Sequence, residues 1–135
     1  MIPQISIIDI IRFQRKHFSF KTQNKACYVL TCRIHGESLF FYNDQEHLVK
    51  RGDVLYIPAG TSYSQSCEEE SLICFHLNIS GQVLPDIKLF SIRDQEKMCE
   101  LFERAEHLWK KKSSNYEFLC MSILYEIISH IQICM

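Results

Sequence analysis

The spacing of apolar residues changes near residue 92, and this change constrains the fold more than any other feature of the sequence. Before it, short runs rich in Tyr, Phe, Val, Ile and Thr alternate with polar or Gly-containing steps, which is typical of β-strands. These runs are residues 26–35, 38–42, 47–49, 53–57, 62–67 and 71–79. Their number and spacing predict an all-β barrel or sandwich.

Two polar steps in this region predict turns. Asn43 and Asp44 separate two strand-like runs, and both residue types tolerate positive φ, so we expect a tight hairpin there. Residues 68–70, all Glu, are expected to form an exposed hairpin tip.

After residue 92 the apolar period becomes about 3.6, which predicts an amphipathic helix. Its apolar face consists of Met98, Leu101, Phe102, Ala105, Leu108 and Trp109. Ser91 or Asp94 is expected to cap its start. A second helix is predicted from Ser114, because Ser114 and Glu117 have the spacing of a capping box.

The second helix is apolar on more than one side, so it needs two surfaces to pack against. The barrel supplies one of them. Either the first helix or a second copy of the chain covers the other, and we favour a homodimer through the C-terminal helices. The residues predicted at this dimer interface are Phe118, Met121, Tyr125, Ile127 and Ile128.

Composition narrows the class of protein. We expect the 135 residues to form a single domain, with a β-barrel region at 1–92 and a helical region at 93–135. A formal net charge of -1 argues against DNA binding by this chain alone. We find no apolar run of the roughly 18 residues that a membrane span needs. The seven cysteines contain no CxxC pair, which favours a reducing cytoplasm. The apolar C-terminal end suggests a cut inside a longer protein.

The segment from Gly52 to Tyr63, GDVLYIPAGTSY, resembles the second cupin motif, with Tyr63 in place of the metal-binding His. Together with the two C-terminal helices, the chain resembles the N-terminal sensing and dimerisation domain of AraC-type transcription regulators. The resemblance spans roughly residue 26 to the end, and the family's helix-turn-helix DNA-binding part lies outside this chain. It implies a cupin-like (double-stranded β-helix) barrel, followed by two α-helices, in a bacterial cytoplasmic regulator that contacts DNA only through the missing part.

A metal-dependent cupin enzyme is the alternative function. The cupin motifs imply ligands at Gln45, at Leu39 and Phe41 (or Ser38 and Phe40), and at Tyr63, and none of these is a metal-binding His or Glu. A substitute set is His35, Glu37, His47 and His76. We expect no metal, no cofactor and no catalysis.

The resemblance instead implies a small-molecule effector inside the barrel, such as a sugar or a carboxylate. Family members bind effectors on three strands, and the matching positions here are Arg33, His35, Tyr63, Gln65, Cys74 and His76. Each pair on one strand is expected to share a face under the period-two rule. Residues 1 to about 24 are expected to close over the barrel mouth when an effector is bound.

Overall fold

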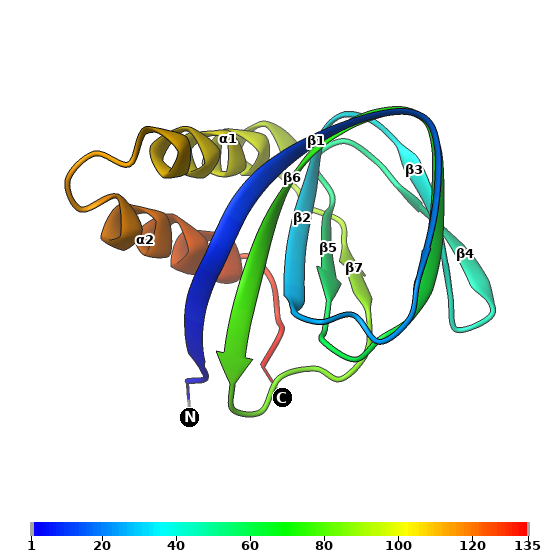
Figure 1. Ribbon diagram of the computed structural model, residues 1–135, viewed down its shortest axis with the longest axis horizontal. Coiled ribbons are helices and arrows are strands. Elements are labelled where there is room, and N and C mark those ends of the chain that lie inside the picture. The colour runs from blue at the N-terminus through cyan, green and yellow to red at the C-terminus, as the bar shows by residue number, and fades with distance from the viewer. Residues whose placement is uncertain (1, 135) are drawn as a thin grey trace.

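The computed structural model describes residues 2–134 and shows a curled β-sheet followed by two helices (Figure 1). The strands are β1 (Gln4–Thr22), β2 (Tyr28–Gly36), β3 (Ser38–Tyr42), β4 (Gln45–Val49), β5 (Val54–Ile57), β6 (Tyr63–Ser80) and β7 (Lys88–Phe90). The helices are α1 (Gln95–Lys111) and α2 (Tyr116–Ile128). The predicted fold class, mainly β with two C-terminal helices, is confirmed.

Strand β6 is the centre of the sheet. The strand order is β4-β3-β6-β2-β5-β7, with antiparallel pairing between the named strands, and β1 pairs with β6 outside that order. One edge of β6 is shared by β3 and β2, while β1 follows the other edge over almost its full length. Figure 1 shows β1 and β6 bending over together, which closes the sheet into a barrel.

The sheet has two apolar faces because side chains alternate along each strand. The outer face packs against α1 and α2, which lie together on one side of the barrel in Figure 1. The inner face forms a second cluster inside the barrel, made of Val29, Phe40, Tyr42, Val49, Leu55, Ile57, Tyr63, Leu72, Cys74 and Ile87. The barrel interior therefore has a core of its own, separate from the core beneath the helices.

The long strands β1 and β6 correct two predictions. Residues 63–80 form one strand, so the expected hairpin tip at residues 68–70 is wrong. Glu69 lies opposite Lys16 and Glu70 lies opposite Arg15, so basic residues of β1 face acidic residues that looked solvent-exposed in the sequence. Residues 4–22 form strand β1, which pairs with β6. The prediction that this segment closes over the barrel mouth is therefore also wrong.

The predicted hairpin at Asn43 and Asp44 is confirmed. Both residues have positive φ, 53° and 59°, between the paired strands β3 and β4. This backbone shape matches the twist of the two strands, so the hairpin fixes the register that places Phe40 opposite His47.

The helix starts agree with one prediction and contradict another. Asp94 caps α1, since its carboxylate accepts a hydrogen bond of 3.1 Å from the backbone N–H of Lys97. The capping box at Ser114 is wrong: α2 is preceded by Asn115 in the left-handed region, and within residues 2–134 that residue makes no side-chain capping bond. Ser114 lies in the turn between α1 and α2. Neither helix of the described chain is long and apolar enough to cross a membrane.

Candidate functional site

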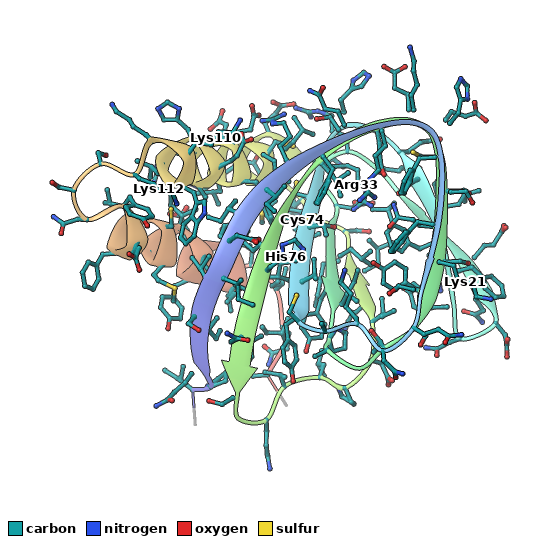
Figure 2. The ribbon with its side chains drawn as sticks, in the orientation of Figure 1. Lys21, Arg33, Cys74, His76, Lys110 and Lys112 are labelled. Carbon is teal, nitrogen blue, oxygen red and sulfur yellow. The ribbon has the colours of Figure 1, made fainter. Side chains whose placement is uncertain are left out.

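Five of the six residues predicted to bind an effector lie on the inner side of the barrel: Arg33, Tyr63, Gln65, Cys74 and His76. Arg33, Tyr63, Gln65 and Cys74 are buried, and His76 is half-buried. In the antiparallel pairing Cys74 lies opposite Thr31 and His76 lies opposite Val29, so they share the inner face with Arg33. Figure 2 shows Arg33 inside the loop formed by the bent β1 and β6, while Cys74 and His76 lie farther along β6.

His35 is placed apart from the other five. A β-bulge follows Arg33: Arg33 pairs with Leu72, and His35 then pairs with Ser71 instead of the residue two positions along β6. The shift turns His35 to the outer face, where it lines a groove of about 470 Å³ with Arg12 and Glu69. The expectation that Arg33 and His35 share a face is therefore wrong, because period-two spacing fails across a bulge.

Arg33 belongs to a buried ionic cluster. Its Nε lies 3.1 Å from Oε1 of Glu70, and its Nη1 donates to Oγ1 of Thr31 at 2.6 Å. The other carboxylate oxygen of Glu70 accepts from Nε2 of Gln65 at 3.3 Å and lies 3.6 Å from Nη1 of Arg15. The cluster therefore contains two guanidinium groups and one carboxylate.

This cluster carries one surplus positive charge in a region removed from solvent. The side chains of Arg33 and Glu70 are both 0% exposed, and that of Arg15 is 19% exposed. Nη2 of Arg33 has no hydrogen-bond partner among residues 2–134. A buried cation is costly unless it is paired and hydrogen-bonded, so the cluster is complementary to one further anionic group.

Aromatic rings connect Arg33 to the barrel mouth. The Arg33 guanidinium lies 5.0 Å from the centre of the Phe40 ring, which stacks on Tyr63 at 5.4 Å. Tyr63 in turn lies 6.4 Å from Phe20 and lines a pocket of about 580 Å³ that also includes Tyr42. Pockets of this size accept small ligands. Phe40 and Arg33 do not line this pocket and lie buried behind Tyr63.

Tyr63 and Cys74 stay protonated at neutral pH. Burial raises the pKa of Tyr63 to about 12, and it raises the pKa of Cys74 to about 11 against the opposing effect of Arg33. A neutral phenol and a neutral thiol donate hydrogen bonds and supply apolar surface. The two residues are therefore suited to contact a ligand.

His76 lies at a different part of the interior. It is opposite Val29, four residues before Arg33 on β2, which corresponds to roughly 13 Å along a strand. Its Nδ1 contacts Oδ1 of Asp9 at 2.5 Å across the β1–β6 pair. His76 is thus engaged with Asp9 and is separate from the Arg33 cluster.

The substitute metal ligands are spread over the fold. His35 and Glu37 are exposed on the outside, His47 lies on β4, and His76 pairs with Asp9. Within the residues that the structure describes, no three His, Cys, Asp or Glu side chains are grouped closely enough to hold a metal ion.

The sequence does not predict three residues of the buried ionic cluster, Glu70, Thr31 and Arg15, or the position of the Phe40 ring beside it. The sequence predicts a hairpin tip at Glu70, because three consecutive Glu residues usually face solvent. The available signal was the opposite charge pattern of residues 12–16 and 68–70, which predicts cross-strand pairing if both segments are strands.

Only part of the predicted dimer interface lies on an exposed face of α2. Phe118 is 78% exposed, Tyr125 is 47% exposed, and Met121 and Ile128 are half-buried. Ile127 is fully buried in the core shared with the barrel, so it does not lie on that face. The apolar surface that remains open on α2 consists of Phe118, Leu119, Met121 and Tyr125.

No family model matches the sequence, and no curated protein sequence matches it. Solved structures of ToxT from Vibrio cholerae do match in three dimensions. The chain has the cupin-like fold of the ToxT N-terminal domain. One ToxT structure, bound to (E)-4-(8-methylnaphthalen-1-yl)but-3-enoic acid, gives a TM-score of 0.60 at 10% identity and covers 95% of this chain and 56% of ToxT.

Two further ToxT structures give the same result. One with bound unsaturated fatty acid has a TM-score of 0.59 at 9% identity and covers 95% of this chain and 54% of ToxT. Another has a TM-score of 0.60 at 10% identity and covers 98% of this chain and 56% of ToxT. The chain thus spans about half the length of the ToxT structures, and the likeness at this identity is one of fold.

Proposed function

We propose that this chain is the effector-sensing domain of an AraC-type transcription regulator and that its effector is a carboxylate with an apolar body. ToxT is an AraC-family regulator, and both ligands named in its structures, an unsaturated fatty acid and a naphthalenyl butenoic acid, have this chemistry. Shared fold supports the assignment to this class of regulator. The ligand class is supported by the interior of the barrel itself.

One observation carries the proposal: Arg33 is a fully buried cation with an unused donor at the inner end of an aromatic path. A guanidinium binds a carboxylate through charge-assisted hydrogen bonds. The rings of Phe40, Tyr63 and Phe20 offer apolar contact for the rest of such a molecule. A sugar would instead need several polar partners along this path, so the rings favour an amphiphilic carboxylate.

Regulation follows if the effector binds one arrangement of the domain better than another. Phe40 and Tyr63 are almost fully buried, so a ligand that reaches Arg33 must displace their rings. These rings belong to β3 and β6, and β6 pairs with β1, β2 and β3. We infer that occupation of the barrel is transmitted through β6 to the helices, which pack on its outer face.

A thermal-shift titration with oleate, methyl oleate and oleyl alcohol tests the ligand class. A ligand present at about 100 times its dissociation constant stabilises the folded chain by about 2.7 kcal/mol. We expect oleate to raise Tm, and the uncharged ester and alcohol to raise it much less, because only the carboxylate pairs with Arg33. An equal shift for all three probes, or no shift with oleate, contradicts the proposal.

We also propose that a second copy of the chain covers the exposed apolar face of α2. Phe118, Leu119 and Tyr125 expose apolar surface on one helix, as expected for an isologous contact between two copies. DNA binding would then belong to the part of a longer regulator that lies outside this chain, in a bacterial cytoplasm. Sedimentation or light scattering measures the oligomeric state directly.

A further inference from the structure

Three buried polar side-chain atoms have no hydrogen-bond partner within the part of the chain that the structure describes. They are Nη2 of Arg33, Oγ of Ser38 and Nε2 of His47. The three residues come from β2, β3 and β4, and Arg33 and Ser38 are 0% and 2% exposed. An unpaired buried polar atom costs free energy, so three of them in one small domain require an explanation.

All three residues surround the same side chain, Phe40. The Arg33 guanidinium lies over the Phe40 ring at 5.0 Å. Ser38 is two residues before Phe40 on β3 and shares its inward face, and His47 lies directly opposite Phe40 in the β3–β4 pair. Neighbours of this kind have Cβ atoms roughly 5 to 7 Å apart, so Ser38 and His47 flank Phe40 on β3 and β4 while Arg33 approaches its ring from β2.

The surroundings of His47 hold its ring in place. Its imidazole stacks on Tyr42 with ring centres 4.1 Å apart. Arg33 is held equally firmly, because its Nε and Nη1 are already bonded to Glu70 and Thr31. The remaining donor of Arg33 and the free nitrogen of His47 are therefore held in fixed positions before any ligand arrives.

We propose that Arg33, Ser38 and His47 form the binding site for the carboxylate of the effector, which we call the Phe40 site. This inference rests on the proposed function and deepens it. A carboxylate has two oxygens with about four acceptor positions, so it can accept one hydrogen bond each from Nη2 of Arg33, Oγ of Ser38 and Nε2 of His47. Its charge also neutralises the surplus positive charge shared by Arg33, Arg15 and Glu70.

The variants Ser38→Ala and His47→Phe test this site in the 135-residue chain, with oleate as the probe. Ser38→Ala removes an unpaired hydroxyl from the free protein, so we expect Tm without ligand to rise by roughly 2 to 4 °C. The same change removes a donor to the carboxylate, so oleate affinity falls roughly tenfold or more. His47→Phe keeps the stack on Tyr42 and also weakens oleate binding.

Methyl oleate and an outward-facing serine provide the matched controls. Ser66→Ala changes an exposed serine of β6, so we expect wild-type Tm and wild-type oleate affinity. Methyl oleate lacks the charge, so its weak binding should change little in Ser38→Ala. A serine with a purely structural role would instead lower Tm when removed and would leave the preference for oleate over its ester intact.

The outcomes separate this inference from the proposed function. If the wild-type chain prefers oleate to its ester and both variants bind oleate as tightly as wild type does, the Phe40 site is wrong and the proposed function stands. If the wild-type chain binds no oleate, the proposed function fails. A lower Tm of the free Ser38→Ala protein overturns the Phe40 site in either case, because it shows that the hydroxyl is already satisfied without a ligand.

Discussion

Replacing Arg33 with Met tests the buried ionic cluster that underlies this account. The side chains of Arg33 and Glu70 are both fully buried, and their closest nitrogen and oxygen atoms lie 3.1 Å apart. Removing one partner of a buried ion pair typically costs about 3 to 5 kcal/mol, because the other charge stays buried without its counter-ion. Glu70 keeps its contacts with Gln65 at 3.3 Å and Arg15 at 3.6 Å, so we expect the lower end, about 3 kcal/mol.

The double variant Arg33→Met, Glu70→Leu separates the pair from its packing. With both charges replaced by apolar groups, the buried site no longer holds an unpaired ion, and replacement of a buried pair in this way is often neutral or stabilising. Arg15 loses a partner, but its side chain is partly exposed and can be solvated. We therefore expect the double variant to be within about 1 kcal/mol of wild type, although Arg33→Met alone is far less stable.

Urea denaturation followed by tryptophan fluorescence measures the free energy of unfolding of both variants. Trp109 reports on unfolding because it is the only tryptophan of the chain and packs against Tyr116 between the two helices. The free energies of unfolding of wild type, both single variants and the double variant form a double-mutant cycle. A loss of less than about 1 kcal/mol in Arg33→Met, or a double variant as unstable as the sum of the single variants, would refute the reasoning.

Three further predictions concern other parts of the fold. Burial raises the pKa of Glu106, but its hydrogen bonds to Arg12 at 3.1 to 3.2 Å outweigh this effect, and the pKa is lowered. The stability that this pair contributes is therefore present above the ordinary carboxyl pKa and is lost as pH falls through the lowered value. Glu106→Gln should flatten the acid side of a plot of Tm against pH, and an unchanged acid side would contradict this. Gly36→Ala should destabilise the chain by about 3 kcal/mol or more in urea denaturation. A Cβ at this position would lie 2.2 Å from the backbone oxygen of Glu69, and the residue has a φ of +78°. A variant as stable as wild type would mean that the strands are spaced differently. Phe118→Asp should change the free energy of unfolding of the monomer by no more than about 0.5 kcal/mol, because the side chain is 78% exposed, and should convert the proposed dimer to a monomer in light scattering. An unchanged dimer would place the interface elsewhere.

The sequence predicts the order of strands and helices well, because the spacing of apolar residues in each segment depends on which of its own side chains are buried. The runs at residues 26–35, 38–42 and 53–57 become strands, and the apolar positions from Met98 to Ala105 become the buried face of α1. The paired long strands are not predicted. β1 and β6 contain charged residues that pair with each other across the sheet, as Arg15 does with Glu70. When each segment is considered alone, those charges interrupt its apolar pattern and resemble a loop between two strands.

The candidate site is predicted in outline for the same reason. Arg33, Tyr63, Gln65 and Cys74 are all buried, and alternation explains why Tyr63 shares a face with Gln65. It does not explain Gln65 and Cys74 together, because they lie an odd number of positions apart on the bent strand β6. His35 does not share the face of Arg33, because a bulge adds one residue to β2 and reverses the faces after it. The sequence names Ser38 and His47 only as possible metal-ligand positions. Their unpaired atoms beside Phe40 could not be predicted, because these depend on how three strands meet in the barrel.

The central claim is that the barrel interior binds a carboxylate at Arg33. A crystal structure of the 135-residue chain with bound oleate tests it most directly. We expect the carboxylate inside the barrel, within hydrogen-bond distance of Nη2 of Arg33, with the apolar chain passing the rings of Phe40 and Tyr63 toward the mouth. Oleate bound only on the outer surface, with Arg33, Phe40 and Tyr63 placed as in the free chain, would contradict the claim.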